Sequence, residues 1–278
     1  MSEDLSEAPP EDPLSRALGY PYPRHSGPVL FDPGSGAVEA HVVDIGPAHG
    51  HFLEGLRAPV PTRSVAVRTG DGTVEIAEAV TLVAAGSNGS TMQLARKYRA
   101  RRHAPPILIA PATITGAVSV YSAHITAYGS VPATMHAADA SAVLHVLLMP
   151  AEELAHMNAT EALGANYVLA APRAMAATVE GVPVPAPLAY VSKRGAVALD
   201  AGPVLLATTG GETTGYASAG QREMMERVKA HVGDERPLEA FVLRLIADRD
   251  ARAAVTSRLA ETGRRWELDR DEIVADGS

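Results

Sequence analysis

The chain contains no cysteine, which excludes disulfides, thiolate catalysis and cysteine-ligated zinc sites. Aromatic residues make up only 4% of its 278 residues, so the core must be built chiefly from alanine, valine and leucine. No run of about eighteen apolar residues occurs, as a membrane-spanning helix would require. The acidic first residues also lack the apolar segment of a secretory signal peptide. These absences predict a cytoplasmic protein with no membrane partner.

An excess of positive charge is missing as well. The formal net charge is −8 and the pI is near 5.7, so we expect no nucleic-acid partner. One basic cluster stands out and has two interpretations. It is either a solvated helix end, whose cations suit the helix dipole, or a rim that attracts an anionic substrate. Its members are Arg96, Lys97, Arg99, Arg101 and Arg102.

Composition divides the chain into five segments. Residues 1–36 are rich in proline, glycine and acidic residues and are expected to form a mostly extended arm. Residues 37–78 form a β-rich extension, 79–205 a mixed core, 206–219 a flexible loop and 220–278 a C-terminal helical region. In a chain so poor in aromatics, three in the arm are candidates to fasten it to the main domain or to another subunit: Tyr20, Tyr22 and Phe31.

Alternating and continuous apolar runs predict strands, and apolar residues three and four apart predict helices. The expected strands cover 38–43, 64–68, 74–76, 79–85, 107–110, 113–120, 121–128, 142–149, 167–171, 177–180 and 188–191. The expected helices cover 91–99, a short stretch from residue 150, 221–232 and 238–260. Residues from 268 onward are expected to be frayed. The pattern predicts a mixed α/β (α+β) fold with a C-terminal helical layer.

A polar turn follows the apolar run that ends at Ala85. Gly86, Ser87 and Asn88 lie between this expected strand and a helix for which Ser90 is a plausible N-cap. Backbone N–H groups in such a turn can bind a carboxylate or polarise a carbonyl group. An ordinary strand-to-helix turn has the same composition. A phosphate loop is excluded, because no Gly-Lys-Ser/Thr follows and no Gly-x-Gly-x-x-Gly is present.

A carboxylate lies at the end of the short expected helix that starts near Pro150. Glu161 comes three residues before Gly164, a natural helix stop. It would therefore lie at the negative end of the helix dipole, where a negative charge is disfavoured. A carboxylate that readily takes up a proton can act as a general acid and base. A solvent-exposed glutamate at a frayed helix end is the other interpretation.

Together, the two elements resemble the gamma-glutamylcyclotransferase-like superfamily. In that family a Tyr-Gly-Ser-Asn turn follows the first core strand and holds the glutamyl group, and the catalytic glutamate lies in a Leu-Asp-x-x-Glu-Gly pattern followed by a tyrosine. The stretch 85–88 is similar to the first pattern, and 157–167, with Glu161 and Tyr167, is similar to the second. Residues 128–134 resemble the segment that closes over the glutamyl group. The resemblance covers roughly residues 80–195.

The resemblance implies a mixed-sheet cyclotransferase-like barrel with an N-terminal β extension and C-terminal helices. It implies that Glu161 moves the proton while a γ-glutamyl amine or amide is converted to 5-oxoproline and a free amine, with no metal or organic cofactor. Two positions depart from the family's pattern: Ala85 replaces its tyrosine and Ala162 replaces its glycine. The substrate-binding residues that the resemblance implies are Gly86, Ser87, Asn88, Tyr128, Gly129, Ser130 and Tyr167.

Two other functions stay open: a non-catalytic protein that binds small molecules or assembles on the same fold, and an amide hydrolase that uses the same glutamate. No His-x-x-x-His or His-Glu-x-x-His pair occurs, so no metal site is expected. His124 is a candidate pocket residue, although such a histidine is more often half-buried with its polar groups satisfied. The polar stretch 208–215 is a linker or a lid. A homodimer through the arm or the C-terminal helices also stays open.

Overall fold

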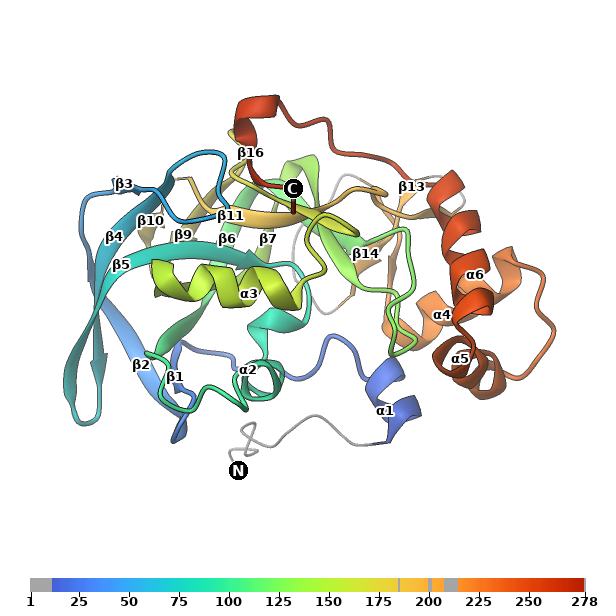
Figure 1. Cartoon of the computed structure of the whole chain (residues 1–278), viewed down its shortest axis with the longest axis horizontal. Helices are drawn as coiled ribbons and strands as arrows, with labels where there is room; N and C mark the ends of the chain where they lie inside the picture. The colour runs from blue at the N-terminus through green and yellow to red at the C-terminus, as the bar shows by residue number, and fades with distance from the viewer. Residues whose placement is uncertain (1–11, 185, 200–201, 208–214, 278) are drawn as a thin grey trace.

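The structure, a computed structural model, describes residues 12–184, 186–199, 202–207 and 215–277. These residues form a mixed α+β fold built on one large mixed sheet, with three helices gathered at one end (Figure 1). The strands are β1 Val29–Asp32, β2 Gly36–Ile45, β3 His49–His51, β4 Val60–Thr69, β5 Gly72–Ala84, β6 Ile107–Tyr121, β7 Ala133–Pro150, β8 Tyr167–Ala170, β9 Ala176–Val179, β10 Val182–Val184, β11 Leu188–Ser192, β12 Ala198–Leu199, β13 Gly202–Pro203, β14 Leu205–Leu206, β15 Ser218–Ala219 and β16 Ile273–Ala275.

The helices are short and lie mostly between strands or after them. They are α1 Pro13–Leu18, α2 Thr91–Lys97, α3 Leu154–Thr160, α4 Gln221–His231, α5 Leu238–Ala247 and α6 Arg249–Glu261, with single 3₁₀ turns at Ser87–Gly89, Ala151–Glu153 and Arg270–Glu272. Helices α2 and α3 lie side by side against the sheet, and α4 to α6 form the separate helical end (Figure 1). No helix of the described residues is long and apolar enough to cross a membrane.

Part of the sheet curls into a ring of strands. Within the described residues, β6, β1, β2, β4, β5 and β7 pair in that order, and β7 pairs back with β6. All of these pairings are antiparallel. Strand β11 then adds to β5 in parallel and carries the sheet on to β8 and β16. The end of β5, where the polar turn begins, is thereby held on both sides by β7 and β11.

Two expected pairs of strands are single long strands in the structure. The hairpin strand expected at 74–76 and the buried strand at 79–85 are both part of β5, which continues past Glu78 at φ 47°. Likewise β6 joins 107–110 and 113–120, with a register shift at Gly116, whose φ is 77°. A Cβ at Gly116 would collide with the Ala174 carbonyl oxygen. In β5 the kink at Glu78 falls in the gap between the two expected strands, where a bulge interrupts the period-two pattern without ending the strand. In β6 the gap expected at 111–112 has no bulge, because Pro111 and Ala112 pair with His145 and Leu144 in unbroken register.

Three further expectations were wrong. Residues 122–132 form a buried loop rather than a strand from 121 to 128. The long helix expected over 238–260 is two helices, because Asp248 ends α5 and its side chain accepts hydrogen bonds from Asp250 N and Ala251 N at the start of α6. The chain end is not frayed, since β16 pairs with β8 and Val274 is 2% exposed.

The described part of the arm is folded into the molecule. Strand β1 lies between β2 and β6, and before it the chain forms α1. The three arm aromatics, Tyr20, Tyr22 and Phe31, are all buried, which confirms that they fasten the arm to the main domain. The first part of the arm, residues 1–11, and the stretch 208–214 expected as a linker or lid lie outside the described residues.

Two apolar clusters cover the two faces of the sheet. One contains Leu94 and Tyr98 of α2 with Leu154 and Met157 of α3, so the three-residue spacing of the last pair gives α3 its apolar face as expected. The other includes side chains of α4 and α5, such as Phe241. Both α2 and α3 are therefore fixed by packing, and their polar faces are left to form a site.

Candidate functional site

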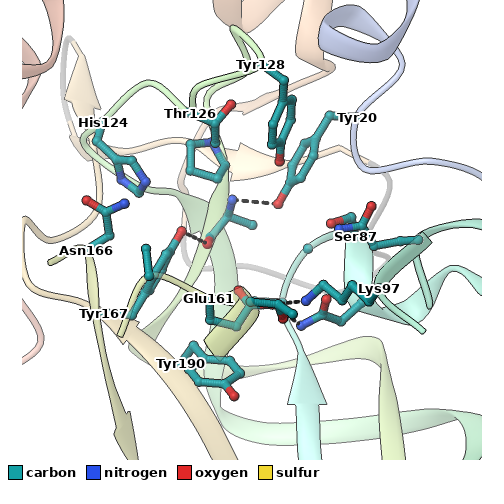
Figure 2. A pocket seen from close by; sticks show the side chains of 18 of the residues that line it. Tyr20, Ser87, Lys97, His124, Thr126, Tyr128, Glu161, Asn166, Tyr167 and Tyr190 are labelled. Atoms are coloured by element: carbon teal, nitrogen blue, oxygen red, sulfur yellow. Dashed lines mark hydrogen bonds and ion pairs between the residues drawn. The ribbon is translucent and has the colours of Figure 1, made fainter. Parts of the chain in front are cut away.

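A pocket of about 310 Å³ opens where β5 ends, between α2, α3 and the 122–132 loop (Figure 2). It brings together segments that are far apart in the sequence. The residues that line it are Tyr20, Val83, Ala85, Gly86, Ser87, Asn88, Gln93, Arg96, Lys97, His124, Thr126, Ala127, Tyr128, Pro132, Ala133, Thr160, Glu161, Ala162, Asn166, Tyr167 and Tyr190.

The structure brings most of the predicted site residues to this pocket. Gly86, Ser87 and Asn88 form one wall, and Glu161 lies beside them at the end of α3. Tyr128 and Tyr167 also line it. The turn and the carboxylate are joined directly, because Asn88 Nδ2 donates a hydrogen bond of 3.0 Å to Glu161 Oε1.

Two predicted binding residues lie behind the pocket. Gly129, at φ 86°, packs against Ile246 of α5 and has no room for a side chain. The Ser130 hydroxyl donates a 2.8 Å hydrogen bond to the Ala17 carbonyl oxygen. Neither residue lines the pocket.

The sequence pattern does not predict the ion pair that Glu161 forms with Lys97. Lys97 Nζ contacts Glu161 Oε1 and also lies 3.4 Å from Met157 Sδ, and the Lys97 side chain is only 6% exposed. Both donors to Glu161 reach the same oxygen, Oε1. Within the described residues no hydrogen bond occupies Oε2, so this second oxygen can take a proton from a bound molecule.

The basic cluster therefore has no single role. Lys97 is buried against Glu161, Arg101 forms an ion pair of 2.6 Å with Glu153, and Arg96 lines the pocket. Gln93, Arg96 and Lys97 follow each other at helical spacing on one face of α2. Within the described part of the chain, Gln93 Oε1 and Arg96 Nε are buried without a hydrogen-bond partner. This face of α2 supplies polar groups and positive charge for a ligand.

Four tyrosines surround the carboxylate: Tyr20, Tyr128, Tyr167 and Tyr190 (Figure 2). Burial raises the pKa of each hydroxyl, and the negative charge of Glu161 raises it further. All four hydroxyls are therefore neutral at any working pH and can donate hydrogen bonds. Tyr190 is fixed by a 2.7 Å hydrogen bond to Asn158 Oδ1.

His124 lines the pocket as an uncharged imidazole. Burial, followed by the charge of Arg194, lowers its pKa to about 3. Its Nδ1 lies 2.9 Å from Ser122 Oγ, and its ring stacks edge-on against Tyr167 at 5.5 Å between centroids. A histidine that stays neutral in this way positions Tyr167 and does not serve as the site's acid or base.

Ala162 adopts a backbone conformation that favours glycine. Its φ is 50°, in the left-handed region, directly after the Glu161 cap of α3. A side chain there strains the turn by about 1–2 kcal/mol. The departure from glycine leaves the turn in place, because Glu161 still faces the pocket.

The described residues contain no group of three or more His, Asp or Glu side chains placed to hold a metal ion. The polar groups of the pocket are instead one carboxylate, one paired lysine, one arginine, one neutral imidazole and several neutral hydroxyls and amides. Such a set suits proton transfer and hydrogen bonding to a small polar organic molecule.

No protein-family model matches the sequence, and a search of curated proteins also finds no match. Among solved structures, the chain is similar to the crystal structure of YkqA from Bacillus subtilis. The two chains share 11% identity, the TM-score is 0.31, and the match covers 80% of this chain and 86% of YkqA. The likeness is remote.

Proposed function

We propose that the chain is a cyclotransferase-like enzyme, on a fold of the gamma-glutamylcyclotransferase-like class, that acts on a γ-glutamyl amine or amide. The observation that carries the proposal is the direct contact between the polar turn and the carboxylate. Asn88 of the turn and Lys97 of α2 hold Glu161 Oε1, and Oε2 stays available inside the pocket. A glutamyl group bound at the turn would place its reacting atoms beside a proton acceptor.

The proposed reaction is intramolecular. The free α-amine of the γ-glutamyl group attacks its own γ-carbonyl carbon, which forms the new C–N bond of a five-membered lactam. Glu161 Oε2 accepts a proton from the attacking amine and returns it to the nitrogen of the leaving amine as the old C–N bond breaks. The products are 5-oxoproline and a free amine. The atoms and electrons of this reaction balance without water, a metal ion or a redox partner.

The charge of the pocket supports a substrate of this kind. The α-carboxylate of a glutamyl group is an anion, and Arg96 adds positive charge to the wall next to the turn. Lys97 keeps the carboxylate of Glu161 oriented, because its Nζ contacts Glu161 Oε1 and is itself held against Met157 Sδ. The reacting amide, a neutral group, then meets neutral hydroxyls rather than further charges.

The test compares Glu161→Gln with the wild type on a panel of γ-glutamyl amines and peptides. Glutamine keeps the shape and the Oε1 acceptor but cannot carry the proton, so we expect the rate of 5-oxoproline formation to fall about 10³-fold. Glu152→Gln, at an exposed position before α3, is the matched control and should keep the wild-type rate. Mass spectrometry measures the product.

Each result separates the proposal from the other functions. Full activity of Glu161→Gln would contradict the role of this carboxylate. Free glutamate in place of 5-oxoproline would show an amide hydrolase that uses the same pocket. Thermal stabilisation by γ-glutamyl compounds without any product would show a binding protein.

A further inference from the structure

One hydroxyl in the pocket comes from outside the segments that the proposed reaction uses. Tyr20 follows α1 in the N-terminal part of the chain, is 5% exposed, and lines the pocket. It lies against Gly86, where a Cβ would collide with its hydroxyl oxygen. Gly86 is thus the residue that lets Tyr20 approach the turn.

One hydrogen bond among the described residues decides whether the Tyr20 hydroxyl acts as donor or acceptor. The backbone N–H of Ala133 donates a 2.8 Å hydrogen bond to the Tyr20 hydroxyl oxygen. An amide N–H can only donate, so the Tyr20 oxygen is the acceptor and its own proton is left over. Within the described residues, no acceptor receives this proton. Burial raises the pKa of Tyr20, with the charge of Glu161 adding to the effect, so the proton stays in place.

Tyr167 shows the opposite polarity at the same residue. Its hydroxyl donates to the Ala133 carbonyl oxygen at 3.1 Å, so its proton, unlike that of Tyr20, already has an acceptor. Figure 2 shows Tyr20, Tyr167 and Glu161 around the same pocket. Of the two hydroxyls that bond to Ala133, that of Tyr20 is therefore the one with a proton left for a ligand.

We infer that Tyr20 is a catalytic residue that donates its free hydroxyl proton, as a hydrogen bond, to the carbonyl oxygen of the amide under attack. The inference rests on the proposed function and deepens it. Negative charge develops on this oxygen when the amine adds to the carbon, and a buried, pre-placed donor stabilises that charge strongly.

The test is Tyr20→Phe, which removes only the hydroxyl. We expect kcat to fall about 100-fold, the loss typical of one oxyanion donor, with KM changed much less. Tyr22→Phe is the matched control. Tyr22 lies two residues away and is also buried, its hydroxyl bonds to the Arg16 carbonyl oxygen at 3.3 Å, and it does not line the pocket. Its kcat should stay within about twofold of the wild type, because it has no group that faces the substrate.

A measurement on the wild type covers the case in which Tyr20→Phe does not fold. In protein labelled with ¹³C at tyrosine Cζ, 5-oxoproline should shift the Tyr20 resonance and leave the Tyr22 resonance unchanged. In a folded Tyr20→Phe variant, the carbonyl stretch of bound ¹³C-labelled 5-oxoproline should move to higher frequency, which a merely structural tyrosine would not cause.

The failures are distinguishable. Wild-type turnover together with an equally active Tyr20→Phe would overturn the role of Tyr20 and leave the proposed function intact. An unshifted Tyr20 resonance at saturating 5-oxoproline would do the same. A wild type that forms no 5-oxoproline from any member of the panel would overturn the proposed function, and the inference with it.

Discussion

The two sides of the pocket come from parts of the chain with very different character. The core side, residues 83–97 with 157–162, consists of a strand end, a turn and two helix faces that are close in sequence or joined by the sheet. The N-terminal segment, residues 12–25, contributes Tyr20 from a proline-rich stretch with a single short helix. The core side carries the charged groups, and the N-terminal segment closes the wall opposite them.

This difference shows how a site can be divided between a scaffold and a segment that docks on it. The core side is held by sheet pairing and by the apolar faces of α2 and α3. The N-terminal segment is held by the burial of Ala17, Tyr20 and Tyr22 and by specific bonds, including Arg24 Nη2 to the Gly86 carbonyl oxygen at 2.9 Å and His145 Nε2 to the His25 carbonyl oxygen at 2.9 Å. The first arrangement is robust, and the second is open to disruption by single changes.

The largest expected effect is a loss of stability as the pH falls, and it tests how the N-terminal segment is held. Burial lowers the pKa of His145 from 6.5 to about 4, and that of His124 to about 3. Because these folded-state values lie below the unfolded value, the unfolded chain binds the protons first and acid destabilises the protein. Each histidine should contribute about 1.4 kcal/mol of lost stability per pH unit as the pH falls below 6.5 towards 4. Above pH 6.5 this contribution is constant.

The measurement is the free energy of unfolding in urea at several pH values. In His145→Gln, the free energy of unfolding should fall less steeply with falling pH, because one of the titrating histidines is gone. The glutamine amide can still donate a hydrogen bond to the N-terminal segment. His103→Gln, at an exposed position, should keep the wild-type slope. An identical slope in wild type and His145→Gln would mean that His145 does not hold the segment as a neutral imidazole.

A substitution of Lys97 tests how much its ion pair with Glu161 stabilises the core side. Lys97→Met leaves Glu161 with Asn88 as its one donor among the described residues. Breaking a fully buried pair costs about 3–5 kcal/mol, and the partial exposure of Glu161 should reduce the loss of unfolding free energy to about 2 kcal/mol. Lys193→Met, whose exposed ammonium bonds to the Gly164 carbonyl oxygen, should cost less than about 0.5 kcal/mol. Equal stability of wild type and Lys97→Met would rule out the ion pair as a support of the core side.

The smallest effect concerns the turn after Glu161. Ala162→Gly relieves the left-handed backbone and should raise the free energy of unfolding by about 1 kcal/mol. Ala159→Gly, inside α3, should lower it by about the same amount, because helical glycine is unfavourable. Thermal and urea unfolding of the two variants gives the signs. Two changes of the same sign would contradict the conformation assigned to Ala162.

The sequence predicts the core side better than the N-terminal segment for a physical reason. The turn at Gly86 and the carboxylate at Glu161 are signalled locally, by an apolar run that stops and by a helix that ends. Lys97 gives a weaker signal, since its charge looks solvated until α3 is packed beside α2. Tyr20 gives none for its position in the pocket, because its partner, Ala133, is more than a hundred residues away. The continuity of β5 is also hidden, because the kink at Glu78 interrupts its period-two pattern.

The most direct test of the central claim follows the oxygen atoms of the product. Wild-type protein would be incubated with a γ-glutamyl amine in H₂¹⁸O and the products analysed by mass spectrometry. Intramolecular attack through Glu161 predicts 5-oxoproline that contains no ¹⁸O from the solvent. Free glutamate that carries ¹⁸O would contradict the claim, because water and not the substrate's own amine would then be the nucleophile in this pocket.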